Sequence, residues 1–142
     1  MNNPFERILL EEVIPMIDAG YRTIADREHR AMAGLSMGGG QTINIAFNKP
    51  DLFRYVALMS PAASGRVAEF YPEHVRNPAP LNKQFKLFWI GVGKDDGLTG
   101  PGDHAFAAAL DPALRVVEDP QRDDLRHEVV SVVLSVVASD TQ

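Results

Sequence analysis

A serine surrounded by glycines is the residue of this sequence with the clearest potential for chemistry. Residues 34–38 read Gly-Leu-Ser-Met-Gly, and two more glycines follow. In a G-x-S-x-G pattern the serine stands on a sharp, strained turn between a strand and a helix, where its hydroxyl can act as a nucleophile. Side chains at positions 34 and 38 would clash with that turn, and Gly39 and Gly40 would let the helix pack close to the sheet. The pattern predicts Ser36 as a catalytic nucleophile.

The helix expected after Ser36 would assist the same chemistry. Backbone N–H groups and the dipole at a helix N-terminus favour a developing negative charge. We therefore expect the N–H of Met37 to be one donor of an oxyanion hole. The alternative is a glycine-rich turn with an incidental serine, because so short a pattern also occurs by chance. Its place between a strand and a helix favours the catalytic interpretation.

The elements that must position Ser36 can be predicted from the spacing of apolar residues. An apolar run at 29–35 predicts the strand before it, and residues 38–48 predict the helix after it. An amphipathic helix is expected over 4–18, with Pro15 distorting its last turn. The other predictions are buried strands at 55–60 and 86–92, a helix at 103–110, a Val-rich strand at 127–137, and mostly loop with one short helix over 61–82.

The alternation of strands with helices indicates the fold class. Strands that are almost continuously apolar are typical of a parallel sheet covered on both faces. We expect an α/β fold in a single domain over 1–142, with a mostly parallel sheet of about four strands flanked by helices. Such sheets place their chemistry at the carboxyl ends of the strands, so the loops after Leu35, Ser60 and Val92 should hold the site.

Two aspartates follow one of these strands. Asp95 and Asp96 follow the strand at 86–92, so we expect them at the same sheet edge as Ser36. A carboxylate there could orient a catalytic histidine. The alternative is a turn without a catalytic role, since an Asp-Gly pair is common in turns.

Three stretches of the sequence resemble one enzyme family. They read FERILLEEVIPMIDAGYR, ADREHRAMAGLSMGGGQTINIAFNKPDLFRYVALMSPA and KLFWIGVGKDDGL. They are similar to the esterase D/feruloyl esterase group of α/β-hydrolases. The resemblance implies an α/β-hydrolase fold and an esterase with a Ser-Asp-His triad. By position, Ser36 would be the nucleophile and Asp96 the acid. Asp95 is the second choice, because the second aspartate of the GKDD turn is the one that matches.

A histidine must take the proton of the serine, because a free hydroxyl is a weak nucleophile at neutral pH. In α/β-hydrolases the order along the chain is serine, acid, histidine, which disfavours His29 and His74 and leaves two candidates. Members of the resembled family have their histidine in a loop of the Gly-Gly-His-Thr-Trp type. This sequence has no such loop.

We predict His127 as the base and His104 as the alternative. A surface or helix-packing histidine is the other interpretation of both. In the layout of the family, His127 would begin the last strand at the far edge of the sheet, about 20 Å from Ser36. It can be the base only if the C-terminal segment is arranged differently. His104 is expected on the helix that leaves the correct edge, eight residues after Asp96.

The two ends of the chain depart from the family. Only one helix precedes the strand of Ser36, whereas the family has several strands there and takes a second oxyanion N–H from one of their loops. We expect an α/β-hydrolase domain shortened at its N-terminus and divergent at its C-terminus. The strand at 29–35 would lack one neighbour, and an unpaired apolar strand promotes association. This predicts a homo-oligomer formed across that edge or by exchanged segments, with 129–137 as a second candidate for such pairing.

Composition excludes several other functions. The 142 residues have a formal charge of -5, which disfavours a nucleic-acid binder. There is no Cys, the four His are scattered, and the glycines lack the spacing of a nucleotide-binding loop, so we expect no metal and no cofactor. No signal peptide or membrane span is visible, which predicts a cytoplasmic protein, although secretion of a longer parent form is also compatible.

The sequence therefore leaves three functions open. The first is a serine esterase that hydrolyses short-chain or aryl carboxylic esters through an acyl-enzyme on Ser36. The second is a catalytically impaired hydrolase remnant that acts as a binding or assembly module. An acyltransferase or thioesterase using the same serine is a third, weaker option. An aromatic-friendly pocket could be lined by Phe70, Tyr71 and Trp89, although core packing explains Trp89 better.

Overall fold

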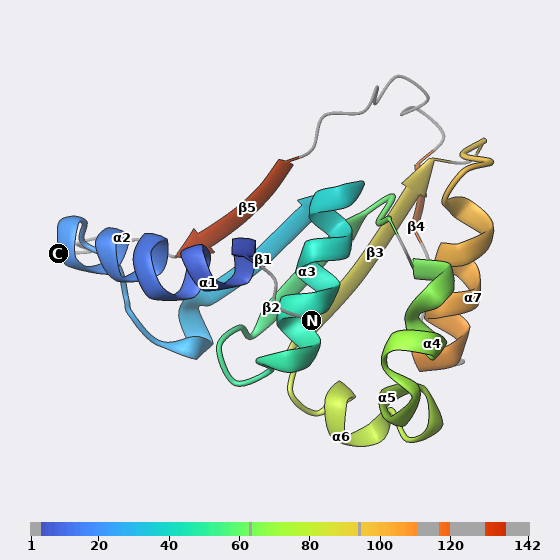
Figure 1. Cartoon of the computed structure of the whole chain (residues 1–142), viewed down its shortest axis with the longest axis horizontal. Coiled ribbons are helices and arrows are strands. Elements are labelled where there is room, and N and C mark those ends of the chain that lie inside the picture. Colours follow the sequence, from blue (N-terminus) through green and yellow to red (C-terminus); the bar gives the residue numbers. More distant parts are fainter. Residues whose placement is uncertain (1–3, 63, 94, 111–116, 120–129, 136–142) are drawn as a thin grey trace, which may run out of the picture.

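The computed structural model describes residues 4–62, 64–93, 95–110, 117–119 and 130–135. Five strands form one sheet in the order β4-β3-β2-β1-β5 (Figure 1). The strands are β1 (Arg30–Leu35), β2 (Tyr55–Met59), β3 (Leu87–Gly93), β4 (Val117–Asp119) and β5 (Val130–Ser135). The helices are α1 (Pro4–Ile8), η1 (Leu9–Val13), α2 (Ile14–Gly20), η2 (Arg27–His29), α3 (Met37–Asn48), η3 (Ser64–Arg66), α4 (Val67–Phe70), α5 (Pro72–Arg76), α6 (Ala79–Asn82) and α7 (Gly100–Leu110).

The sheet is mostly parallel, as expected. β1 pairs with β2, β2 with β3 and β3 with β4, all in parallel. The predicted α/β fold is therefore confirmed, with five strands rather than about four. The extra strand, β4, has only three residues, too few to show a period in the sequence.

The strand before Ser36 does not lack a neighbour. β5 lies antiparallel beside β1, with Arg30 opposite Ser135 and Leu35 opposite Val130. The expectation of an unpaired edge at 29–35 was wrong, because the Val-rich segment of the same chain occupies it. Such β-branched residues suit a strand.

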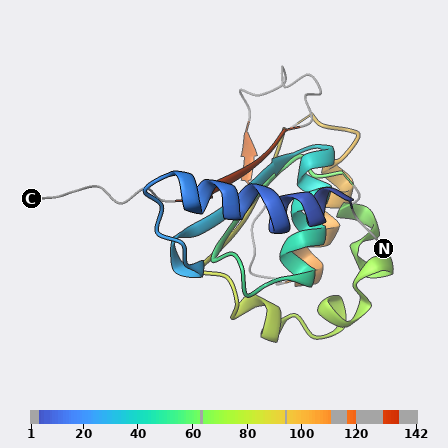
Figure 2. The same cartoon turned by 60° about the vertical axis from the view of Figure 1, so that its left-hand side comes forward.

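The helices of the described part of the chain cover only one face of the sheet. Figures 1 and 2 show α1, α3 and α7 on the same side. Among the described side chains of β1–β3, every buried hydrophobic one points to that side: Met32, Val56, Leu58, Ile90 and Val92. All of these except Val92 belong to core clusters with Ile43, Ile45, Ala46 and Phe47 of α3 and Phe106 of α7. The expectation of a sheet covered on both faces is not met by these helices.

The first helix and the loop region differ from prediction because of proline. The helix runs on from Pro4 to Gly20, but its middle turn, η1, is a π-helix. Pro15 has no N–H to donate to the carbonyl four residues before it, and its ring crowds that carbonyl, so the distortion precedes the last turn. Between residues 61 and 82, Pro72 and Pro80 stand in the first turns of short helices, where proline is favoured.

Arginines hold the amino end of the sheet. The guanidinium of Arg30, at the start of β1, donates to an Asp18 carboxylate oxygen at 2.8 Å, and the Thr23 hydroxyl donates to the other oxygen at 2.8 Å. The guanidiniums of Arg27 and Arg54 both donate to the backbone carbonyl of Gln84, just before β3. Charged side chains thus tie the connections together at this end.

Candidate active site

Ser36 occupies the sharp turn that its pattern predicts. It lies between β1 and α3 with φ 52° and ψ −118°, and its side chain does not cap the helix. A positive φ is strained in a residue other than glycine. Three backbone hydrogen bonds hold it: the Ser36 N–H donates to Met59 O at 2.9 Å, and Ser36 O accepts from Ala62 N–H at 2.7 Å and Gly40 N–H at 3.1 Å.

The glycines around Ser36 have steric reasons. A Cβ on Gly34 would lie 2.2 Å from the carbonyl oxygen of Gly38, closer than real Cβ atoms come. A Cβ on Gly39 would lie 2.7 Å from the Cα of Pro61, and one on Gly40 2.7 Å from the carbonyl oxygen of Ala62. Gly39 and Gly40 thus allow α3 to approach the segment that follows β2. This segment lies closer to the two glycines than the sheet does.

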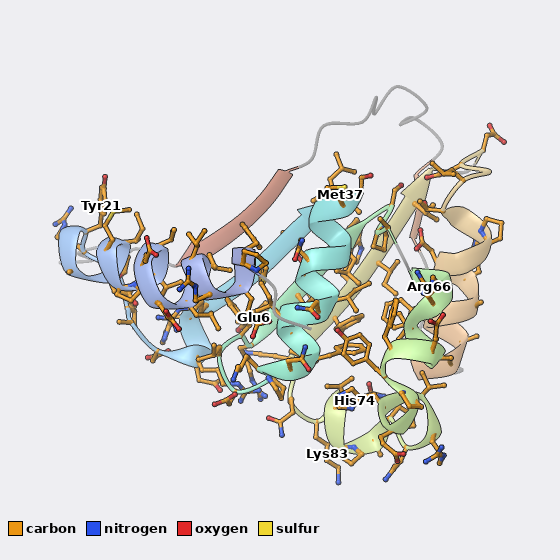
Figure 3. The ribbon with its side chains drawn as sticks, in the orientation of Figure 1. Glu6, Tyr21, Met37, Arg66, His74 and Lys83 are labelled. Carbon is orange, nitrogen blue, oxygen red and sulfur yellow. The ribbon has the colours of Figure 1, made fainter. Side chains whose placement is uncertain are left out.

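Met37 begins α3 directly after Ser36. Its N–H belongs to the first turn of the helix, where backbone donors have no partner within the helix. Its side chain is 58% exposed and lies at the carboxyl end of the sheet (Figure 3). The local geometry therefore suits the oxyanion role predicted from the sequence.

The Asp96 carboxylate accepts hydrogen bonds from the turn that follows β3. Its Oδ1 accepts from the N–H groups of Leu98 and Thr99, each at 2.9 Å, and its Oδ2 accepts from the Thr99 hydroxyl at 2.8 Å. Burial raises the pKa of this carboxyl, but the hydrogen bonds from Thr99, Ser60 and Leu98 together lower the pKa below its usual value of 3.8. Asp96 is therefore an anion at neutral pH, as a triad acid must be.

Ser60 is a residue of this site to which the sequence assigned no role. It directly follows β2, has φ 40°, and its N–H donates to Gly91 O of β3 at 2.8 Å. Its side chain is among the causes that lower the pKa of Asp96. The sequence indicated only that the loop after Ser60 would lie at the site edge, because a positive φ in a serine leaves no trace in the pattern of apolar residues.

The histidines of the described residues are distributed over both ends of the sheet. His104 is exposed on α7, outside the stripe of Asp103, Phe106 and Ala107 by which that helix packs. His29 stands before β1 at the amino end, with Nδ1 2.7 Å from Asp26. His74 stacks on Tyr71, and Figure 3 shows it far from Met37. His127, the predicted base, lies outside the described residues.

Comparisons with known proteins show the family of this chain. A family model described as "Putative esterase" matches residues 1–133. The chain belongs to this esterase family. Over 96 residues it is 38% identical to an endo-1,4-beta-xylanase/feruloyl esterase of Xylanibacter ruminicola, an alignment that spans 68% of this chain and 12% of that protein.

The chain is also similar to a solved structure. A ferulic acid esterase superposes with a TM-score of 0.60 and 26% identity, over 81% of this chain and 52% of its own. The chain therefore spans about half of that esterase and a small part of the xylanase/feruloyl esterase. The resemblance to the feruloyl esterase group of α/β-hydrolases is confirmed.

Two of the aromatic side chains suggested as a pocket for an esterase substrate lie apart. Tyr71 packs in the core, with its ring 5.3 Å from that of Phe47. Trp89 lies on the helix-free face, where its ring covers Gly91 so closely that a Cβ there would be 2.1 Å away. Core packing therefore does not explain Trp89.

Among the described residues, no group of three or more His, Asp and Glu could hold a metal ion, and no helix is long and apolar enough to cross a membrane.

Proposed function

We propose that this protein is a serine esterase that hydrolyses short-chain or aryl carboxylic esters through an acyl-enzyme on Ser36. The observation that supports it most is the backbone of Ser36, which is held at φ 52° at a strand-to-helix turn that three glycines make sterically possible. Strain of this kind persists only where the surrounding structure enforces it, and it is concentrated at functional sites. Aryl esters such as feruloyl esters are favoured by the names of the two relatives described above.

The reaction follows from the positions of these groups. The Oγ of Ser36 attacks the ester carbonyl carbon while a histidine takes its proton, and the Met37 N–H donates to the oxyanion. The alcohol leaves with that proton, and water then attacks the acyl-enzyme to release the acid. One oxyanion donor is typically worth about 10²–10³ in rate, so a second donor would add a similar factor.

His127 is the proposed base, and the direction of β5 supports it. Because β5 runs antiparallel to β1, its first residue, Val130, pairs with Leu35, next to Ser36. His127 is only three positions before Val130, and a chain covers about 10 Å at most over three positions. The far-edge location expected from the family's layout therefore does not apply to the start of β5. His104 remains the alternative, and Asp96 is the proposed acid.

The test is hydrolysis of 4-nitrophenyl acetate and methyl ferulate by the purified chain. Ser36→Ala should abolish turnover above the buffer rate while leaving the circular dichroism spectrum unchanged. His127→Ala should lower kcat by about 10³ or more, with His74→Ala as the matched control that leaves it unchanged. Labelling of Ser36 by a seryl-directed phosphonate gives an independent readout. Equal rates in the wild-type and Ser36→Ala chains would reject the esterase.

A second candidate function, a binding or assembly module, is supported by the helix-free face of the sheet. Its described side chains are apolar and none is buried: Ala31, Ala33, Leu35, Tyr55, Ala57, Met59, Leu87 and Trp89. Because β5 occupies the edge of β1, a homo-oligomer would form through this face instead. Sedimentation velocity tests it: Leu87→Lys, at a 49% exposed position, should dissociate the oligomer, and a monodisperse wild-type monomer would contradict it.

A further inference from the structure

The two oxygens of the Asp96 carboxylate are bound unequally by the turn at 96–99. Oδ1 accepts the N–H groups of Leu98 and Thr99, each at 2.9 Å, and Oδ2 accepts the Thr99 hydroxyl at 2.8 Å. A carboxylate offers about four positions for donors, roughly two on each oxygen. The positions on Oδ1 are therefore filled by backbone N–H groups, and any further donor must approach Oδ2.

The turn itself is fixed at both ends by backbone hydrogen bonds. The Asp96 N–H donates to Gly93 O, at the end of β3, at 3.0 Å. On the other side, the Asp103 N–H of α7 donates to Thr99 O at 2.9 Å. Asp103 is fully buried, so this contact lies against the packed side of the helix. Thr99 is thus anchored to α7 while its side chain reaches back to the carboxylate.

The hydroxyl of Thr99 restrains the carboxylate in a way that the backbone donors do not. Bonds to Oδ1 hold the position of that one atom, whereas a bond to Oδ2 also holds the plane of the group. A β-branched side chain has few χ1 rotamers, so this hydroxyl is itself well placed. The plane decides where the remaining acceptor position of Oδ2 points. In a triad, the acid accepts the histidine N–H and so sets the tautomer and orientation of the imidazole.

We propose that Thr99 is a positioning residue of the esterase site, whose hydroxyl fixes the Asp96 carboxylate so that Oδ2 accepts the N–H of the catalytic histidine. This inference rests on the proposed function. Thr99 acts through the carboxylate and not on the ester. An aspartate that only stabilises its own turn would have no effect on turnover, so the two roles can be separated by experiment.

The test compares two variants of the full chain. Thr99→Val removes the hydroxyl but keeps the branched shape and the backbone N–H, whereas Thr99→Ser keeps the hydroxyl. The Asp96 carboxyl is titrated by its ¹³C chemical shift in the labelled chain. Loss of a donor to the charged form should raise the pKa of Asp96 in Thr99→Val, and Thr99→Ser should leave it unchanged.

Thr23→Val is the matched control for the loss of a hydroxyl. The Thr23 hydroxyl also donates to a carboxylate at 2.8 Å, that of Asp18 at the opposite end of the sheet. Because both Thr→Val variants lose one such hydrogen bond, their melting temperatures should fall by similar amounts. Thr23→Val should leave the Asp96 titration and kcat at their wild-type values.

The kinetic readout separates positioning from stability. Thr99→Val should lower kcat about ten-fold with an unchanged KM, and Thr99→Ser should retain the wild-type rate. In an active chain, a Thr99→Val variant with the wild-type kcat or the wild-type Asp96 titration would overturn the inference. Equal losses of kcat in Thr99→Val and Thr23→Val would also overturn it. A raised pKa of Asp96 in Thr99→Val, beside a wild type that hydrolyses no ester, would instead reject the proposed function and leave the Thr99–Asp96 contact standing.

Discussion

The two ends of the sheet are held together by different means. At the amino end, the guanidiniums of Arg27, Arg30 and Arg54 bind carboxylates and backbone carbonyls of neighbouring segments. At the carboxyl end, Ser36 and Ser60 are held in strained conformations by backbone hydrogen bonds. Long side chains can adjust when a neighbour changes, whereas a backbone turn in close contact cannot. We infer that changes at the amino end affect stability alone, whereas changes at the carboxyl end also affect the geometry of the site.

The largest effect is expected from Gly34→Ala at the carboxyl end. The new Cβ would meet the Gly38 carbonyl at 2.2 Å, so the backbone of the turn must shift. Unfolding in urea should show a loss of roughly 3–5 kcal/mol, with loss of turnover. Gly97→Ala is the control, because nothing lies within 4 Å of a Cβ there. Equal stability of the two variants would contradict the steric account.

A smaller effect, on stability alone, is expected from Asp18→Ala at the amino end. It leaves the Arg30 side chain, only 9% exposed, without its carboxylate partner. The free energy of unfolding should fall by roughly 2–3 kcal/mol. Turnover of the folded fraction should not change, which separates this end from the site.

The double variant Asp18→Ala/Arg30→Met sharpens that prediction. With the buried charge removed as well, part of the lost stability should return. A double variant as unstable as the sum of the two single changes would show that the ion pair itself contributes little.

The smallest effect is a pH dependence at the carboxyl end. Burial raises the pKa of Asp96, but the hydrogen bonds to its anion together lower the pKa by more than burial raises it. The pKa in the folded chain therefore lies below the ordinary value of 3.8. The anion therefore adds stability that is fully present above the unfolded pKa and is lost as the pH falls through the folded pKa. Urea midpoints of the wild type and Asp96→Asn, measured from pH 6 to pH 2, should converge at the acid end. A difference between the two midpoints that stays constant over this pH range would contradict the prediction.

Much of this arrangement could be predicted from local patterns. The strands at 30–35, 55–59 and 87–93, the helix after Ser36 and the glycines of its turn all follow from apolar spacing and steric need. The direction of β5 could not be predicted, because antiparallel and parallel neighbours of a central strand have the same Val-rich pattern. The φ of Ser60 could not be predicted either, because the residue is held by a hydrogen bond to Gly91, which is 31 positions further along the chain.

The pairing of β5 with β1 has a consequence for how the chain folds. Leu35 and Val130 are 95 positions apart, so the pair closes a very long loop. At a synthesis rate of about 5–20 residues per second, β1 would leave the ribosome roughly 5–20 s before its partner. During that interval the apolar edge beside the nucleophile is open to other chains, so aggregation during synthesis competes with the arrival of the last strand.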